Sequence, residues 1–213
     1  MSASGKRLAI LLSGRGSNFI AIADAVANGR LDAEIAIVIS NKPEANGIAS
    51  ALARNFNAVV IPSKGHTRLA YDHLLMKEID KHEPDLICLA GYMRLLSAEF
   101  VRQYPHRILN IHPSLLPAFP GLDVQKAALD NGVKYSGCTV HFVDEGLDSG
   151  PILKQAVVPV LDTDTVDTLA ARILMQEHRI YSEAIALVLS GKWRIEGRRV
   201  IELPSGIESS TKP

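Results

Sequence analysis

Three polar side chains have the types needed to act together on a carbonyl group, namely those of Asn110, His112 and Asp148. Asn110 and His112 alternate with apolar residues, so they face the same way if this segment is a β-strand. Pro113 follows at once, and proline ends a strand ladder because it has no N–H to donate. An amide and an imidazole are therefore expected at the carboxyl end of a strand, where open α/β sheets bind ligands. The alternative is that both side chains only satisfy backbone groups of the loop.

The chemistry that suits these three groups is acyl transfer. Asn110 can donate a neutral N–H to a developing oxyanion. A carboxylate beside an imidazole favours the charged imidazolium, so Asp148 would prepare His112 to act as a general acid. The sequence offers no well-placed serine or cysteine nucleophile with a base, and no cluster with metal-ligand spacing. We therefore predict direct transfer through a tetrahedral intermediate, with the attacking amine supplied by a substrate and without a metal; whether Asp148 reaches His112 is left open.

A glycine-rich turn, Ser-Gly-Arg-Gly-Ser-Asn at residues 13–18, follows the first apolar run. Glycines allow a tight turn and close approach of a ligand, and Ser17 or Asn18 could cap the next helix. A helix N-terminus reached through such a turn is a typical phosphate site. Phe19 replaces the third glycine of the dinucleotide fingerprint, and no Walker lysine follows, so neither of those nucleotide-binding classes is favoured. A tight turn and cap without any ligand is the equal alternative.

A second loop, Gly91 to Leu96, mixes exposed backbone with apolar side chains after the apolar run Leu86 to Ala90. Such a loop suits a flat ring system that needs apolar walls and backbone hydrogen bonds. Ordinary core packing under a short helix is the alternative. Arg68 and Glu177, each on a predicted helix, could face a ligand or could be solvated surface charges.

The elements that must position these groups alternate between strand and helix. Strands are predicted at Arg7–Leu12, Ala33–Ile39, Ala58–Ile61, Leu86–Ala90 and Ile108–Ile111, and helices at Phe19–Ala27, Gly47–Arg54, Thr67–His82 and Ser97–Tyr104. This order predicts parallel strands with right-handed crossovers. The glycine turn and the loops after the fourth and fifth strands would then open on the same edge of the sheet.

The remaining chain changes pattern after the fifth strand. A helix is predicted at Leu122–Leu129, strands at Ser136–Val143 and Ile152–Val160, a long helix at Val166–Leu189, and a hairpin of Lys192–Ile195 and Arg198–Ile201. Strands that follow one another across a short loop indicate an antiparallel ending to the sheet.

Composition limits the classes of protein that this chain can belong to. Its 213 residues, 47% of them hydrophobic, predict one domain at residues 1–202 with a flexible tail at 203–213. A formal net charge of +0 argues against binding of nucleic acid through its phosphates. Cys88 and Cys138 lie in apolar or strand-like segments and predict buried thiols in a reducing compartment. No segment is long and apolar enough to cross a membrane, so we expect a soluble, cytoplasmic protein.

Four segments together carry a family resemblance: residues 13–18, 91–96, 110–117 and 148–151. Their sequence and order resemble the motifs of the phosphoribosylglycinamide formyltransferases, and the likeness runs from about Arg7 to about Ile201. The resemblance implies a Rossmann-like formyltransferase fold of the α/β class, with a mostly parallel sheet, antiparallel C-terminal strands and helices on both faces. It implies transfer of a formyl group from the cosubstrate 10-formyltetrahydrofolate to the amine of glycinamide ribonucleotide, in de novo purine biosynthesis.

The resemblance also implies roles for individual residues. The catalytic residues would be Asn110, His112 and Asp148. The ribonucleotide would be held by Gly16, Ser17, Asn18 and Glu177. The folate would be held by Arg68, Met93, Arg94, Leu95, Leu96, Asn110 and Asp144. The Leu116–Pro117 bond would be cis, and Ala118 stands where some relatives carry a lysine.

Three other functions compete with this expectation. A methionyl-tRNA formyltransferase would need a more basic surface and a further C-terminal domain. A formyltetrahydrofolate hydrolase would use water and should not need the turn at residues 13–18. A nucleotide-binding module would leave Asn110, His112 and Asp148 unexplained. The expected partners are the two small substrates, without nucleic acid or membrane, and the expected assembly is a monomer or homodimer.

Overall fold

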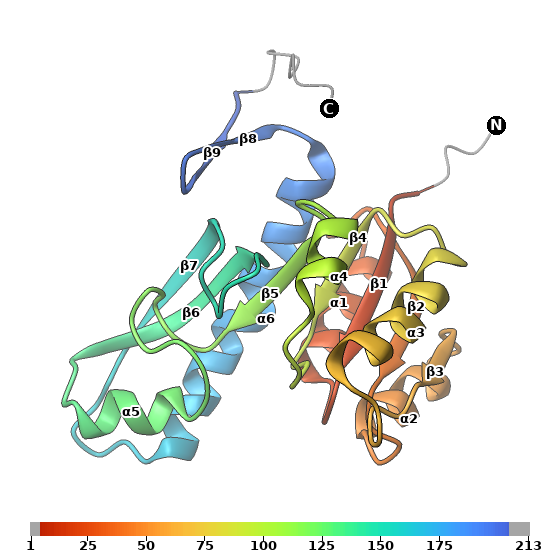
Figure 1. The fold of residues 1–213 in the computed structure, drawn as a ribbon. Coiled ribbons are helices and arrows are strands. Elements are labelled where there is room, and N and C mark those ends of the chain that lie inside the picture. The colour runs from red at the N-terminus through yellow and green to blue at the C-terminus, as the bar shows by residue number, and fades with distance from the viewer. Residues whose placement is uncertain (1–4, 205–213) are drawn as a thin grey trace. The chain divides into compact units, whose positions relative to one another are not determined.

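The chain divides into two compact units, one ending at Asn110 and the other beginning at Ile111 (Figure 1). The computed structural model describes residues 5–204. Most of the predicted tail at 203–213 lies outside the described residues, and the single domain at 1–202 stays a prediction. Each unit is described below by itself.

The first unit is built on a parallel sheet. Its strands are β1 (Arg7–Leu12), β2 (Glu34–Ser40), β3 (Ala58–Val60), β4 (Leu86–Leu89) and β5 (Ile108–His112), the last of which runs on to His112. Their order is β3-β2-β1-β4-β5, and each neighbouring pair is parallel. Residues 8–12 of β1 are completely buried, as the continuous apolar run predicts for the centre of a parallel sheet. The predicted parallel strands with helical crossovers are confirmed.

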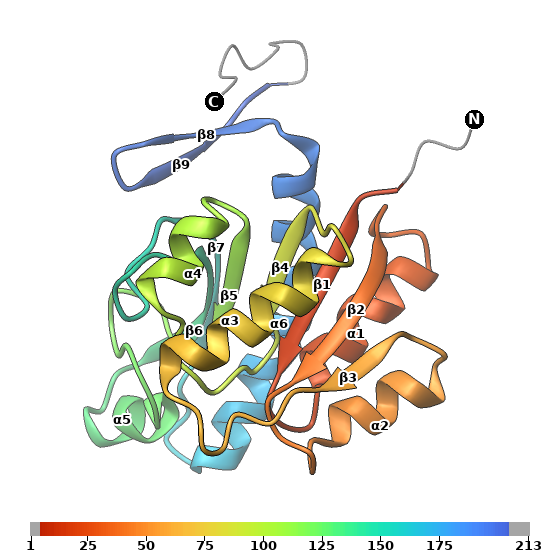
Figure 2. The same ribbon diagram turned by 45° about the vertical axis from the view of Figure 1, so that its right-hand side comes forward.

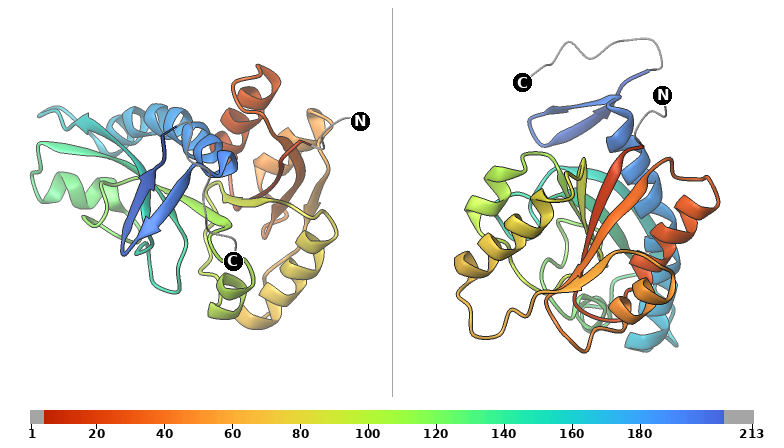
Figure 3. Two further views of the ribbon diagram at one scale, coloured as in Figure 1. Left: turned by 90° about the horizontal axis from the view of Figure 1, so that it is seen from above. Right: turned by 90° about the vertical axis from the view of Figure 1, so that its right-hand side faces the viewer.

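Helices lie on both faces of this sheet. They are α1 (Ser17–Ala27), α2 (Asn46–Ala53), α3 (Arg68–Asp80) and α4 (Ala98–Gln103). Figure 3 shows α1 on one side of the strands and α3 with α4 on the other, and α3 packs against α4. The crossovers from β1 to β2 and from β3 to β4 therefore leave the sheet on opposite faces.

The start of α1 differs from the prediction that Ser17 or Asn18 caps it. The N-cap is Gly16, which makes no side-chain cap and has a left-handed backbone with φ +77°. A Cβ atom at Gly16 would lie 2.7 Å from the Cα of Gly47, so only glycine fits this turn without a shift of the backbone. The close approach of two backbones, rather than a capping side chain, decides where α1 begins.

The second unit begins at the end of β5 and contains an antiparallel pair. Its strands β6 (Tyr135–Phe142) and β7 (Ile152–Pro159) are antiparallel, and α6 (Val166–Ser190) packs against both and against α5 (Val124–Asp130). Strands β8 (Trp193–Glu196) and β9 (Arg199–Glu202) form a hairpin after α6 (Figure 2). A single parallel register, Ile152 with Arg199, joins β9 to β7. The predicted antiparallel pair, long helix and hairpin are confirmed.

A buried threonine holds the proline-rich segment after β5 against β6. Thr139 is completely buried, and its hydroxyl donates to the Ser114 carbonyl at 2.7 Å and accepts from the Leu116 N–H at 3.0 Å. The Gln155 amide donates to the same hydroxyl and to the Leu116 carbonyl, each at 2.9 Å. The Leu116–Pro117 bond is cis, as expected. Side chains of β6 and β7 thus hold a loop that has no ladder of its own.

Two further expectations concern the burial of the cysteines and the presence of membrane-spanning helices. Cys88 and Cys138 are buried and are not joined in a disulfide, as their apolar surroundings predict. Among residues 5–204, no helix combines the length and the apolar character that crossing a membrane requires.

The contact between Gly16 and Gly47 gives a prediction about stability. Gly16→Ala should lower the free energy of unfolding by about 2 kcal/mol more than Gly29→Ala, because overpacking against backbone adds to the left-handed strain. Gly29 is the matched control, since it has φ +68° and no atom lies within 4 Å of the place that a Cβ atom would take there. Urea denaturation of both variants measures the difference, and equal losses would contradict the close-contact explanation.

The buried threonine gives a second stability prediction. Thr139→Val keeps the shape of the side chain but leaves several buried backbone and amide groups without their partner, so the free energy of unfolding should fall by about 2 kcal/mol or more. Thr163→Val, at an exposed position, should change it by less than about 0.5 kcal/mol. Thermal and urea unfolding of the two variants check this, and a small effect at both positions would show that the network contributes little.

Candidate active site

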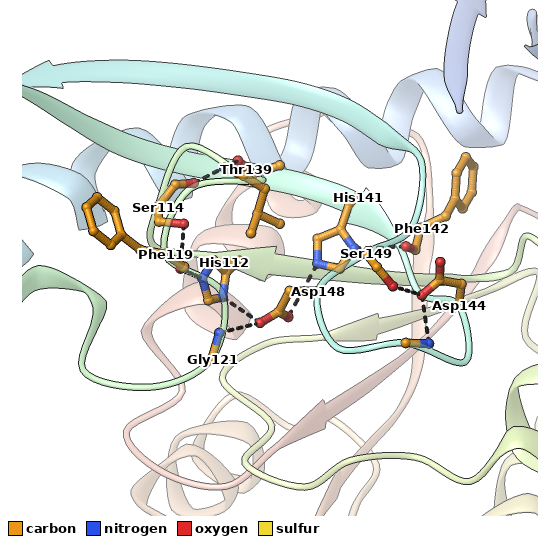
Figure 4. Close-up of polar contacts among 12 residues, drawn as sticks. His112, Ser114, Phe119, Gly121, Thr139, His141, Phe142, Asp144, Asp148 and Ser149 are labelled. Atoms are coloured by element: carbon orange, nitrogen blue, oxygen red, sulfur yellow. Dashed lines mark hydrogen bonds and ion pairs between the residues drawn. The ribbon is translucent and has the colours of Figure 1, made fainter. Parts of the chain in front are cut away.

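The imidazole of His112 lies beside the carboxylate of Asp148 within the second unit (Figure 4). The separation that the sequence left open is 3.4 Å, between Nδ1 of His112 and Oδ2 of Asp148. His112 is 4% exposed, and the Gly121 N–H donates to the same carboxylate oxygen at 2.8 Å. A buried imidazole and a nearly buried carboxylate therefore face each other across Nδ1 and Oδ2.

The other ring nitrogen of His112 meets a backbone carbonyl. Its Nε2 lies 2.9 Å from the Phe119 oxygen, and because a carbonyl can only accept, Nε2 must carry a hydrogen. The Ser114 hydroxyl lies 2.6 Å from the Ala118 oxygen and 3.0 Å from the Phe119 oxygen, which helps to place this carbonyl. The Phe119 oxygen thus occupies the position in which an oxyanion would accept a hydrogen bond from His112.

A second histidine, which the sequence reasoning did not select, faces Asp148 from the other side. Nε2 of His141 lies 3.8 Å from Oδ1 of Asp148, and its Nδ1 lies 2.8 Å from the Phe142 oxygen. The side chain is 2% exposed, and burial lowers the pKa of His141 below its ordinary value. The sequence does place this histidine on a predicted strand, seven residues before the candidate carboxylate Asp148. That spacing indicates a contact between the two side chains only if the intervening loop folds back on the strand.

The loop from Asp144 to Gly150 does fold back on β6. The Asp144 carboxylate accepts from the Gly146 N–H at 3.0 Å and from the Ser149 hydroxyl at 2.6 Å. A Cβ atom on Gly150 would lie 1.8 Å from the Phe142 oxygen, so glycine is required at this return. Asp148 itself has a left-handed backbone with φ +49°. The loop therefore places Asp148 at a strained position, between the two imidazoles.

Asn110 lies on β5 two residues before His112 and is half-buried, so the two side chains share one face of the strand. In the first unit its register partner is Leu89 of β4. The amide and the imidazole are therefore presented together at the strand's carboxyl end, as the alternation predicts.

The glycine-rich turn and the Met93 loop adjoin within the first unit. The Ser13 N–H donates to the Gly91 oxygen at 3.0 Å, and the Ser13 hydroxyl accepts from the Met93 N–H at 2.8 Å. The same hydroxyl donates to the Asn41 side-chain oxygen at 2.6 Å. The loops after β1 and β4 therefore open on the same edge of the sheet, as predicted.

The exposure of the candidate binding residues distinguishes between core packing, surface charge and a position open to a ligand. Met93 and Leu95 are 62% and 50% exposed, so they do not pack in the core, and the Arg94 guanidinium lies 4.8 Å from the centre of the Tyr71 ring. Glu177 on α6 is 8% exposed and is thus not a solvated surface charge, whereas Arg68 is exposed at the first turn of α3.

The turn at Gly16 precedes a helix N-terminus that carries no acidic residue. It leads into the first turn of α1, whose N–H groups have no acceptor within the helix and whose residues include no acid. Among residues 5–204 the structure brings together no group of three or more His, Cys, Asp or Glu side chains able to hold a metal ion.

Comparison with known proteins identifies several relatives. Residues 6–185 match the formyl transferase family model. The chain is 43% identical over 189 residues to phosphoribosylglycinamide formyltransferase of Escherichia coli, a match that covers 88% of this chain and 89% of that protein. It is 47% identical over 194 residues to the trifunctional purine biosynthetic protein adenosine-3 of Drosophila melanogaster. That match covers 90% of this chain but spans only 14% of the fly protein.

Solved structures agree with this relationship. Glycinamide ribonucleotide transformylase 1 from Symbiobacterium toebii superimposes with a TM-score of 0.92 and 48% identity, over 95% of this chain and 96% of that one. A formyltetrahydrofolate deformylase from Pseudomonas syringae gives a TM-score of 0.89 at 26% identity, over 95% of this chain and 67% of its own. The Rossmann-like α/β formyltransferase fold is thereby confirmed, and the chain belongs to the formyl transferase family.

Proposed function

We propose that this protein transfers a formyl group from 10-formyltetrahydrofolate to the amine of glycinamide ribonucleotide, a step of purine biosynthesis. The observation that carries the proposal is the buried pair of His112 and Asp148, in which Nε2–H of the imidazole is directed at an oxygen atom. The names of the relatives that match nearly the whole chain specify transfer of a formyl group to this ribonucleotide.

The proposed reaction proceeds by direct attack of the substrate amine on the formyl carbon. A carbon–nitrogen bond forms, and the formyl oxygen takes up negative charge. His112 stabilises that oxygen through Nε2–H, the donor that is bonded to the Phe119 carbonyl, and Asn110 supplies a second donor. When the tetrahedral intermediate collapses, the bond to the folate nitrogen breaks and that nitrogen gains the proton that the amine loses. Asp148 stabilises the imidazolium of His112 throughout.

Two groups of residues are proposed to hold the substrates. Gly16, Ser17 and Asn18 would bind the ribonucleotide phosphate, which is supported by the first turn of α1 and its lack of acidic residues, and Glu177 would bind near the amine. The folate would contact Arg68, Met93, Arg94, Leu95, Leu96, Asn110 and Asp144, which is supported by the exposed apolar side chains of the Met93 loop. We propose a cytoplasmic enzyme, monomeric or homodimeric, that acts on these small molecules and needs no metal.

Hydrolysis of the formyl group is the second candidate function, because a formyltetrahydrofolate deformylase has the same fold. The two reactions differ in the molecule that accepts the formyl group, which is the ribonucleotide amine in transfer and water in hydrolysis. Incubation with 10-formyltetrahydrofolate should release tetrahydrofolate only when glycinamide ribonucleotide is present, with formylated ribonucleotide recovered in equal amount. Release without the ribonucleotide would establish hydrolysis instead. Absence of release under both conditions would contradict both candidates and leave only a binding protein with this fold.

The role of Asp148 is tested by Asp148→Asn. The amide keeps the size of the side chain but cannot stabilise an imidazolium, so kcat should fall by about 10²-fold to 10⁴-fold. The midpoint of thermal unfolding should change little. Asp130→Asn, which removes an exposed carboxylate paired with Lys126 at the surface, is the matched control and should leave kcat unchanged. Turnover of Asp148→Asn within a few-fold of the parent would refute the proposed role.

A further inference from the structure

The acidic loop, which runs from Asp144 to Gly150, holds Asp148 in a conformation that its backbone does not favour by itself. Asp148 has φ +49°, a left-handed value that residues other than glycine seldom adopt. Strained residues of this kind persist only where the surrounding structure holds them. The contacts that fix the acidic loop therefore decide whether the Asp148 carboxylate stays beside His112, 3.4 Å from its Nδ1.

The acidic loop has contacts of two kinds. The Asp144 carboxylate accepts from the Gly146 N–H at 3.0 Å and from the Ser149 hydroxyl at 2.6 Å, and both of these bonds lie within the loop. The Ser149 carbonyl, directly after Asp148, instead accepts from Nη2 of Arg198 at 2.5 Å. Arg198 lies 49 residues further along the chain, so this bond joins the acidic loop to the C-terminal hairpin.

The tight turn of the hairpin gives Arg198 a fixed position on the backbone. Gly197 and Arg198 are the two residues between β8 and β9, and Glu196 is paired with Arg199 on either side of them. Gly197 has φ +61°, and a left-handed glycine in a two-residue connection is typical of the turns that join antiparallel strands. The side chain of Arg198 thus extends from the tip of a regular hairpin.

The hairpin also contacts both strands that flank the acidic loop. The Trp193 ring centre lies 5.0 Å from that of Phe142, the last residue of β6, and the Trp193 indole N–H donates to the Val188 carbonyl of α6 at 3.0 Å. On the other side of the loop, Ile152 at the start of β7 is in register with Arg199. The hairpin is therefore anchored on β6, β7 and α6, and Arg198 reaches the loop from this support.

We propose that Arg198 is a positioning residue for the formyl transfer: its guanidinium holds the Ser149 carbonyl, and through it the acidic loop, in the arrangement that keeps Asp148 beside His112. The proposal rests on the proposed function. A hydrogen bond from a charged donor is stronger than one between neutral groups, so this contact favours the strained loop conformation over more open ones. Arg198 contacts no reacting atom in this role and acts only through the loop.

Removal of the guanidinium should change turnover and folate binding but not ribonucleotide binding. In Arg198→Ala, kcat should fall by about threefold to tenfold, because a smaller fraction of the protein holds Asp148 in place. KM for 10-formyltetrahydrofolate should rise by a similar factor, since Asp144, a proposed folate contact, lies on the same loop. KM for glycinamide ribonucleotide should stay within about twofold, because its proposed contacts lie outside the loop.

Two further variants separate positioning from a purely structural role. Arg198→Lys restores a charged donor of similar reach, so most of the lost kcat should return. Arg194→Ala removes a guanidinium of the same hairpin that donates to Glu196 at 2.7 Å, and it should leave all kinetic constants unchanged. A purely structural role predicts a lower midpoint of thermal unfolding for Arg198→Ala, with kcat and KM of the folded protein equal to those of the parent, and that result would overturn the proposal.

Amide hydrogen exchange tests the contact itself without any substrate. Exchange at residues 145–149 should be about threefold or more faster in Arg198→Ala than in the parent or in Arg194→Ala, with equal exchange in β1 of all three. Equal exchange in the loop would overturn the proposal even if activity falls, and faster exchange with parental kinetic constants would refute the role in turnover. If the parent transfers no formyl group, the proposed function fails, while the exchange rates still decide whether Arg198 holds the loop.

Discussion

The structure of the second unit depends on one constraint, a carboxylate held between two buried imidazoles. Each ring is oriented by a backbone carbonyl, from Phe119 or Phe142, and the carboxylate of Asp148 meets the remaining nitrogen of each. Charged groups are costly to bury unless they are paired and hydrogen-bonded, and the Asp148 carboxylate has the Gly121 N–H and the two imidazoles as its neighbours. The chemistry of the site and its stability therefore have the same physical origin.

The loops that supply these groups are held by buried polar contacts rather than by sheet ladders. Thr139 and Gln155 bind the backbone of the proline-rich segment, and glycine at position 150 lets the acidic loop return against β6. Networks of this kind are rigid only when every member has a partner. In the first unit Ser13 has the same function, since its hydroxyl and N–H join the glycine-rich turn to the Met93 loop. In each unit, the loops that carry the candidate site residues are thus held by side chains of neighbouring strands.

The hydrogen bond between His112 and the carbonyl of Phe119 affects what the imidazole can bind. It accepts the hydrogen on Nε2 of His112, so this nitrogen is not an unpaired buried donor. A substrate oxygen that replaces it gains a hydrogen bond at the cost of the existing one. In the proposed reaction, binding at this position would therefore favour an oxygen that carries more negative charge than a backbone carbonyl, as an oxyanion does.

The sequence by itself determined the order of strands and helices, the parallel crossovers and the shared face of Asn110 and His112, because periodicity and chain order are local properties. It did not determine the N-cap at Gly16, which follows from a backbone contact with Gly47, or the place of His141 beside Asp148, since no local pattern distinguishes His141 from a core residue. Only the tertiary structure brought Asp148 to within 3.4 Å of His112. The return of the acidic loop depends on contacts between residues distant in the chain, and a single sequence carries no measure of those distances.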